Sequence, residues 1–438
     1  MRKLIVLLLL LVASPVWAAV SIQEVRTPGG LVAWLVREPS IPLVAVEFGF
    51  RSGGSALDPE GRQGLANFAS GLLDEGAGEL DSAAFQRRLE ELAVKLDFSA
   101  DRDEFTGSLQ TLTKHKAEAF RLLGMALNQP RFDAEAVERI RAQVLTRLVR
   151  DLEDPNTVAN RAWFDRAFAG HPYHKPVWGY PETVKAIAEE DLRAFARSRL
   201  SRDGLVIAVV GDITAEELGP LLDGAFGALP AAGDASSSIA ESKPTSLGRL
   251  EVIRRQIPQS AIAFGLPGIK RDDPDWYAAH VMNYILGGGG FNSRLMEEVR
   301  EKRGLTYGVY TYLYPLEHAG VWLGGVATQN ARVAESLEVI RATLAAFVAE
   351  GPTDKELADA KTYINGSFPL SLSGSSRIAR LLTSVQRNGL GVDYLDKRDA
   401  LMNAVTREDV LRVARRLLDP AGLFTVVVGD PKGVNGSG

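Results

Sequence analysis

The stretches EDLRAFARSRLSRDGLVIAVVGD (190–212) and EDVLRVARRLLDPAGLFTVVVGD (408–430) align without a gap. Each reads as an amphipathic helix opened by acidic residues, then a turn, then a buried strand that ends in Gly-Asp. A second pair lies upstream, where VAVEFGF (44–50) matches SAIAFGL (260–266). The chain is therefore predicted to contain two copies of one unit of helices and strands.

A segment rich in Ala, Ser, Gly and Pro separates the copies, as is typical of a linker. It is LPAAGDASSSIAESKPTSL, and we place the linker at 229–248. The first predicted domain is then 19–228 and the second is 249–438. Hydrophobic periodicity predicts helices at 81–92, 116–128, 133–152, 156–168, 273–286, 293–302, 331–349 and 354–368, and strands at 105–112, 305–314 and 320–326.

The composition is that of a globular protein with ordinary charge. Of the 438 residues, 46% are hydrophobic and 24% charged, and the net charge is −5. No long run of one sign is present, so nothing favours a nucleic-acid partner. Cysteine is absent, which excludes disulfides, cysteine metal sites and cysteine nucleophiles.

The first residues, MRKLIVLLLLLVASPVWAAVS, read as a bacterial secretory signal. Arg2 and Lys3 precede a short apolar run, and small residues at Val16 and Ala18 predict cleavage near Ala18, so that 1–18 is a signal peptide. The run is short for a membrane anchor. We expect a periplasmic protein with no transmembrane segment.

Few residues could bind a metal or a phosphate group. Only His171 and His174 are close together among the five histidines, and their Gly/Pro-containing loop favours side chains that hydrogen-bond the backbone. Gly287 to Gly290 lack the lysine and Ser/Thr of a phosphate-binding loop, which favours a flexible loop or a close backbone approach. Arg300 and Tyr307 lie across a helix end and a strand start. They could grip a peptide carbonyl, although spacing alone favours a surface arginine and a half-buried tyrosine.

Five stretches resemble the pitrilysin, insulinase and mitochondrial-processing-peptidase family of zinc peptidases. They are FGFRSGG (48–54), GLANFASGLLDEG (64–76), HPYHKPVWG (171–179), VVGD (209–212) and YILGGGGFNSRLMEEVREKRGLTYGVY (284–310). The resemblance implies an α+β fold of two homologous domains. Each domain would be a mainly antiparallel sheet packed with helices on one side, and together they would line part of a clam-like chamber.

The family binds zinc through an H-x-x-E-H helix and a glutamate further along the chain. The resemblance places the three motif positions on Asn67, Ser70 and Gly71, and the glutamate position on Thr146 or Arg147. None of these is a zinc ligand or general base of the family. We therefore expect no zinc in this chain.

In the family, an arginine and a tyrosine of the second half face the zinc site and hold substrate, and they match Arg300 and Tyr307. The resemblance thus implies a non-catalytic subunit, similar to that of bacterial two-subunit members. A homologous partner would supply zinc, and this chain would supply the pair in trans to a peptide held by strand addition. The segment 105–112 is expected at the equivalent edge of the first sheet. Two alternatives stay open, a peptide-binding or scaffold protein without a peptidase partner and an enzyme with metal at His171 and His174.

Overall fold

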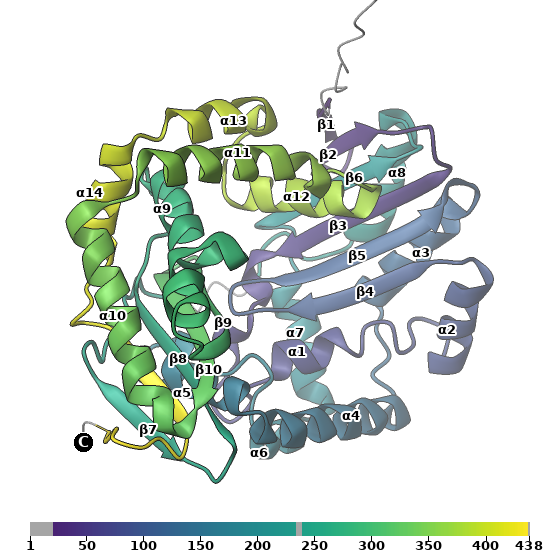
Figure 1. Cartoon of the computed structure of the whole chain (residues 1–438). Helices are drawn as coiled ribbons and strands as arrows, with labels where there is room; N and C mark the ends of the chain where they lie inside the picture. The colour runs from purple at the N-terminus through teal and green to yellow at the C-terminus, as the bar shows by residue number, and fades with distance from the viewer. Residues whose placement is uncertain (1–20, 234–238, 437–438) are drawn as a thin grey trace, which may run out of the picture.

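Two β-sheets, one from each half of the chain, form the framework of the computed structural model, which describes residues 21–233 and 239–436 (Figure 1). The first sheet has the strand order β1-β2-β6-β3-β5-β4 and the second has β7-β11-β8-β10-β9. The first comprises β1 (Gln23–Arg26), β2 (Val32–Arg37), β3 (Leu43–Phe50), β4 (Lys95–Ala100), β5 (Phe105–Leu112) and β6 (Leu205–Gly211). The second comprises β7 (Leu250–Arg254), β8 (Gln259–Pro267), β9 (Thr306–Pro315), β10 (Gly320–Gln329) and β11 (Phe424–Gly429).

The two sheets have the same plan once β1 is set aside. Each sheet has one parallel pair, which is β2 with β6 in the first sheet and β7 with β11 in the second. From β6 or β11 onward, each strand runs antiparallel to its neighbour. The aligned stretches form α7 (Glu189–Arg199) with β6, and α14 (Arg407–Leu417) with β11. The predicted α+β fold with two homologous, mainly antiparallel halves is confirmed.

Most helices begin and end close to their predicted residues. In the first half they are α1 (Leu65–Ser70), α2 (Ser82–Glu91), α3 (Lys116–Asn128), α4 (Ala134–Glu153), α5 (Pro155–Ala167), α6 (Pro181–Ala186), α7 and α8 (Ala215–Phe226). In the second they are α9 (Trp276–Asn283), α10 (Val333–Glu350), α11 (Asp354–Ser371), α12 (Ser375–Arg387), α13 (Tyr394–Ala404) and α14. The predicted helices 273–286 and 293–302 differ, because they contain the π-helical turns Tyr284–Gly288 and Met296–Glu301.

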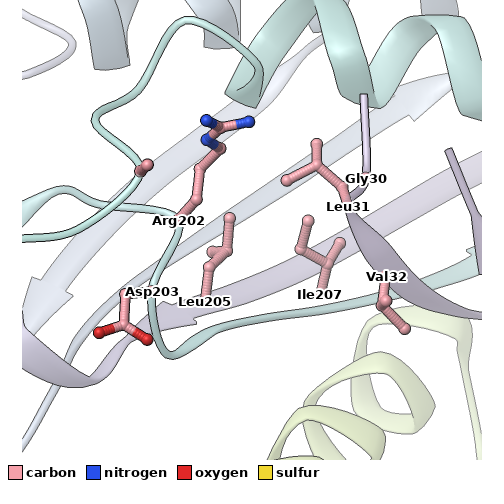
Figure 2. A pocket seen from close by; sticks show the side chains of 8 residues that line it. Gly30, Leu31, Val32, Arg202, Asp203, Leu205 and Ile207 are labelled. Atoms are coloured by element: carbon pink, nitrogen blue, oxygen red, sulfur yellow. The ribbon is translucent and has the colours of Figure 1, made fainter. Parts of the chain in front are cut away.

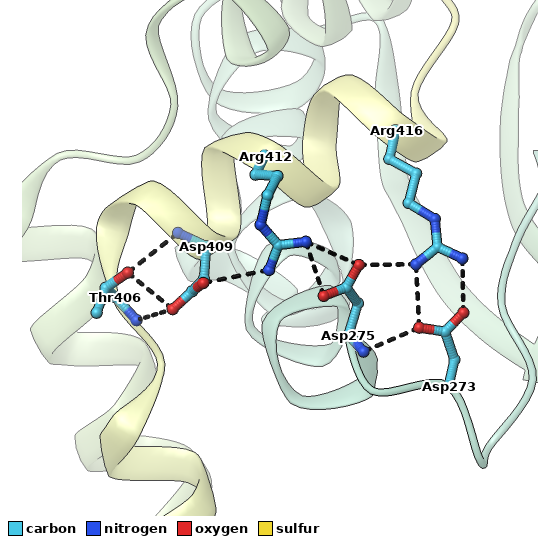
Figure 3. A network of polar contacts seen from close by, with 6 residues as sticks. All are labelled: Asp273, Asp275, Thr406, Asp409, Arg412 and Arg416. Atoms are coloured by element: carbon cyan, nitrogen blue, oxygen red, sulfur yellow. Dashed lines mark hydrogen bonds and ion pairs between the residues drawn. The ribbon is translucent and has the colours of Figure 1, made fainter.

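In both copies of the repeated helix, an aspartate of the first turn accepts a hydrogen bond from the backbone N–H of the residue before the helix. The backbone N–H of Ala188 donates to Asp191 at 2.8 Å, and that of Thr406 donates to Asp409 at 3.0 Å. Figure 3 shows that α14 is further tied to the start of α9, since Arg412 and Arg416 bond carboxylates just before that helix. The carboxylates belong to Asp273 and Asp275. The capped helix start satisfies N–H groups that have no partner within the helix.

Each sheet packs one face on helices of its own half and receives a helix of the other half on the opposite face. Helix α5 of the first half lies on β8 and β11, where Trp163 is fully buried and donates to the carbonyl of Phe424 at 3.2 Å. Helix α12 of the second half lies on β3 and β6, with Leu382 and Val385 packed among Trp34 and Ala208. The helices are therefore not confined to one side of each sheet. Strands such as β11, buried at every residue, require cover on both faces.

Polar contacts also join the halves. Asp103, between β4 and β5, accepts hydrogen bonds from the Tyr173 hydroxyl and from the N–H of Glu317, the latter at 2.9 Å. Arg387 at the end of α12 pairs with Glu104. The contacts of Glu317 with Asp103 and of Arg387 with Glu104 cross from one half to the other and hold the sheets in one arrangement.

The described part of the predicted linker runs beside the end of α5. The N–H of Thr245 donates to Ala167 at 2.7 Å and that of Ser242 donates to His318 at 2.8 Å. The predicted signal peptide, 1–18, lies outside the described residues. No helix within 21–233 and 239–436 combines the length and the hydropathy that a membrane span needs.

Candidate functional site

Arg300 and Tyr307 line one cavity of about 330 Å³ where β9 begins. Gln259 and Gln329, at the facing ends of β8 and β10, add two amides to its wall. The two side chains that the sequence places seven positions apart thus share a solvent-open hollow. Their contribution to binding stays a prediction.

Arg300 lies near the end of the π-helical turn and keeps its guanidinium near the surface. The guanidinium lies over the exposed ring of Phe291, 4.6 Å from its centre, and Nη1 is 2.6 Å from Glu301. Gly304, with a φ of +60°, then turns the chain into β9, and its N–H donates to the Arg300 carbonyl at 2.8 Å. Exposed ion pairs contribute about 1 kcal/mol or less. The contact with Glu301 therefore leaves the guanidinium available to a ligand.

A β-bulge turns Tyr307 outward. Thr306 pairs with Thr328 and Val309 pairs with Val326, so that two residues of β9 lie opposite Ala327 alone. Strict alternation would place Tyr307 on the same face as the buried Val309. With the bulge, the tyrosine is instead 87% exposed. It extends from the last strand of the sheet, whose outer edge has no strand partner within the described residues.

The glycine run before Arg300 is a close backbone approach, one of the two possibilities that the sequence left open. A Cβ atom on Gly287 would lie 2.5 Å from Oγ1 of Thr311, and one on Gly288 would lie 2.6 Å from the amide nitrogen of Asn283. The absence of side chains lets the π-helical turn press against β9.

The helix that would hold zinc in the family is short and packed. Helix α1 ends at Ser70, with Asn67 and Ser70 buried, and the Ser70 hydroxyl donates to the Asn67 carbonyl at 2.7 Å. A Cβ atom on Gly71 would lie 3.2 Å from Cγ2 of Ile140 on α4. Gly71 therefore lies at a close contact between this helix end and α4.

The position of the third ligand is likewise used for other contacts. The Thr146 hydroxyl donates to the carbonyl of Ala142 at 2.8 Å. The Arg147 guanidinium lies 3.8 Å from the ring centre of Trp178. In the described part of the chain, no three His, Cys, Asp or Glu side chains gather as a metal site would require. Asn67, Ser70, Gly71, Thr146 and Arg147 do not fit a zinc ion.

The two histidines of the loop at 171–174 contact defined neighbouring groups. Nε2 of His171 is 2.9 Å from the carbonyl of Ala240, and Nδ1 accepts from the N–H of Tyr173 at 3.2 Å. His174 lies 3.6 Å from Asp165. Both ring nitrogens of His171 thus contact backbone groups, as expected for this loop, whereas His174 faces a carboxylate.

One expectation about the first sheet is wrong. The segment 105–112 is β5, which lies between β3 and β4, so it is an interior strand. The edge is β4 (Lys95–Ala100), which was not among the predicted strands. The alternating pattern of KLDFSA was the signal available for it.

Comparisons with known proteins bear on the whole chain. Residues 42–179 match the family described as insulinase (peptidase family M16), and residues 186–364 match the one described as peptidase M16 inactive domain. The chain belongs to the M16 peptidase family. A solved M16 structure, the peptidase M16 inactive domain from Pseudomonas fluorescens, covers 95% of this chain and 99% of its own at a TM-score of 0.87 and 28% identity.

Relatives of this M16 chain have names of two kinds. A Helicobacter pylori protein named non-peptidase homolog YmxG is 28% identical over 368 residues, 84% of each chain. A Bacillus subtilis protein named uncharacterized zinc protease YmxG is 23% identical over 402 residues, 90% of this chain and 95% of that one. Membership of the family therefore leaves the question of catalysis to the residues of the site.

Proposed function

We propose that this M16 chain is the metal-free subunit of a two-chain zinc peptidase that acts in the periplasm. A homologous partner with an intact H-x-x-E-H helix supplies the zinc, its ligands and the general base. This chain supplies Arg300 and Tyr307 to the peptide substrate and is no peptidase when alone.

The observation that supports this most is the contrast between the two sites of the chain. The predicted zinc-motif positions Asn67 and Ser70 are buried and Gly71 packs against α4, whereas Arg300 and Tyr307 line an open cavity. The name of the Helicobacter pylori relative, a non-peptidase homolog, agrees with a chain of this kind.

The two side chains suit a peptide carbonyl whose oxygen gains charge during attack. Arginine offers a planar fork of N–H donors, and tyrosine offers one O–H donor. Donors placed where charge develops stabilise the transition state, and the loss of one typically lowers kcat by about 10²–10³. Arg300 reaches such an oxygen by exchanging its exposed contact with Glu301.

The strand next to the pair can hold the substrate. The outer edge of β9 has no strand partner within the described chain, and a peptide that adds to such an edge is held by main-chain hydrogen bonds. This strand takes the place of β5 in the proposal, because β5 is an interior strand. Its edge adjoins the side chains that contact the scissile region.

Reconstitution tests the proposal. The purified chain should bind no stoichiometric zinc and cleave no peptide, and cleavage should appear when a zinc-bearing M16 homologue from the same cell is added. Arg300→Ala should then lower kcat by about 10²-fold or more. Arg303→Ala is the matched control, since Arg303 is an exposed arginine of the same helix end and pairs with Glu298.

Three outcomes would contradict the proposal in different ways. Stoichiometric zinc with activity in the lone chain would make it an enzyme. Peptide binding without any zinc-bearing partner in a native co-purification would favour the alternative of a periplasmic scaffold. Equal activity of the Arg300→Ala and Arg303→Ala complexes would remove Arg300 from the site.

A further inference from the structure

Exposed aromatic side chains gather around Arg300. The described residues hold five exposed aromatic side chains, and four of them lie within 291–312, namely Phe291, Tyr307, Tyr310 and Tyr312. The cavity of about 340 Å³ where β2 and β6 begin differs in this respect, since none of the described residues that line it is aromatic (Figure 2). A cluster of exposed apolar side chains marks a binding surface.

Four tyrosines of β9 form a row on one face of the second sheet. They are Tyr307, Tyr310, Tyr312 and Tyr314, and together we call them the tyrosine row. The last three pair with alternate residues of β10, and Tyr314 packs against the apolar cluster that includes α5. The bulge places Tyr307 on the same face, because it lies opposite Ala327, the next alternate residue of β10.

A glycine of β10 lets the ring of Tyr310 lie against the sheet. A Cβ atom on Gly325 would lie 2.6 Å from the Tyr310 hydroxyl and 2.8 Å from its Cζ, so a side chain there would displace the ring. The next ring, of Tyr312, is 6.2 Å away between centres and only 21° from parallel. Rings that the sheet already holds in place lose little conformational entropy when a ligand stacks on them.

The tyrosine row connects two cavities. Tyr307 lines the cavity of Arg300, and Tyr312 and Tyr314 line another, of about 780 Å³, where the two halves of the chain meet. From Tyr307 to Tyr314 the strand advances about 23 Å, at about 3.3 Å per residue. An extended peptide bound at Arg300 can therefore follow the row into the larger cavity.

The charges around the row do not favour an ionic ligand. Four basic and four acidic side chains line the larger cavity, so neither sign prevails there. Arg300 lies at one end of the row, and Arg102 lies near the other, where its guanidinium is 3.9 Å from the ring centre of Phe164. That ring packs edge-on against Tyr314. A cationic side chain would meet an arginine at either end, whereas an uncharged aromatic ring stacks on the tyrosines without this repulsion.

We infer that the tyrosine row selects peptides with an aromatic side chain about three residues from the carbonyl held at Arg300. The position of that carbonyl rests on the proposed function. Tyr310 follows Tyr307 by three residues, which is the spacing that an extended peptide alongside β9 would share. Tyr310 and Tyr312 are then specificity-determining residues, and the substrate class is a peptide that contains phenylalanine, tyrosine or tryptophan.

Titration of the purified mature chain, followed by saturation-transfer difference NMR, tests the contact without a partner. The probes are three blocked hexapeptides of serine and alanine that carry one phenylalanine, one leucine or one arginine at the same position. We expect the phenylalanine peptide to bind about threefold or more tightly than the other two, with the largest saturation on its ring protons. Equal binding of the three peptides, or no binding of any, would overturn the inference.

Variants identify the rings responsible. Tyr310→Leu and Tyr312→Leu retain an apolar side chain without the ring, and each should remove the preference for phenylalanine. Tyr363→Leu is the matched control, since Tyr363 is the fifth exposed aromatic side chain and stacks on Tyr284. Circular dichroism establishes that each variant is folded. A preference that survives in both row variants, or that is lost in Tyr363→Leu, would contradict the assignment.

The reconstituted complex separates this inference from the proposed function. Cleavage of a peptide with phenylalanine three residues from the cleaved bond should have a higher kcat/KM than cleavage of its leucine counterpart, and Tyr310→Leu should lower that ratio. Active complexes without this preference would overturn the inference and leave the two-chain function standing. If no mixture is active, the two-chain function fails, and the titration of the lone chain still decides whether the row binds aromatic peptides. Loss of complex formation in Tyr310→Leu with unchanged peptide preference would assign the row to the subunit interface instead.

Discussion

Gly71 is the position predicted for the second histidine of the family's zinc motif, and its surroundings leave little room for a histidine. A Cβ atom there already lies 3.2 Å from Ile140, which is tighter than ordinary van der Waals contact. The backbone of Gly71 is unstrained, with a φ of −81°. Its small size therefore serves the packing of α1 against α4.

Restoring the motif residues should harm the fold without creating a zinc site. We expect the variant Asn67→His, Ser70→Glu, Gly71→His to lose about 1–3 kcal/mol of unfolding free energy, because a histidine at 71 overpacks the contact with Ile140. Urea denaturation and zinc analysis measure the two effects. Asn67→His alone is the control, because it adds a histidine to α1 and leaves the contact between Gly71 and Ile140 unchanged. Equimolar zinc in a variant of undiminished stability would show that the positions still form a site.

At the scale of elements, α1 depends on a carboxylate from outside the helix. Asp58, almost fully buried, accepts the N–H groups of Gly64 and Ala66 at 2.9 and 3.1 Å. Burial raises the pKa of Asp58 to about 7, against the opposing effect of these hydrogen bonds. The helix start is thus satisfied by a side chain in the preceding loop, since Gly64 at the N-cap has none.

This carboxyl group makes stability depend on pH. Its folded pKa is raised, so its contribution is fully present below the unfolded value near pH 4 and is lost as pH rises through about 7. The loss, complete above pH 7, is on the order of 4 kcal/mol. Asp58→Asn lacks this titration.

The stability deficit of Asp58→Asn relative to the parent chain should therefore be larger at pH 5 than at pH 8. Urea midpoints of both proteins at the two pH values measure the difference, and all other groups cancel in it. A deficit that stays constant or grows with pH would show that Asp58 does not titrate in this window.

At the scale of the whole molecule, neither half is complete without the other. Helix α12 covers Trp34, Val36, Ala208 and Val210 of the first sheet. Helix α5 covers the second sheet in return. Each half thus has its own sheet, but one face of that sheet is covered by a helix of the other half. The unfolding of one half should therefore destabilise the other.

A fragment of residues 21–233 should accordingly fail to fold as a soluble monomer, because its first sheet exposes the apolar surface that α12 covers. Co-expression with residues 239–438 should restore a complex that elutes with the parent chain in size-exclusion chromatography. Fusion of residues 375–388 to the first fragment should recover part of its solubility. A stable, monomeric first fragment without this helix would contradict the exchange as the basis of stability.

Sequence patterns alone determined the duplication, most helices and the family. The aligned stretches at 190–212 and 408–430 predict equivalent helix–strand units, and α7 with β6 and α14 with β11 confirm them. The missing zinc motif and the match of Arg300 and Tyr307 to the substrate-holding pair are implied by the resemblance to the family, and spacing alone does not give them. These features are encoded by residues close together in the sequence, so their periodicity and order can be read directly from it.

Tertiary structure decided which surfaces meet. The bulge opposite Ala327 exposes Tyr307, against simple alternation along β9. The contact of Gly71 with Ile140 and the exchange of α5 and α12 join residues far apart in the chain. Apolar side chains in a local pattern show that an element must be covered, but not by which element. That choice depends on the packing of the complete chain.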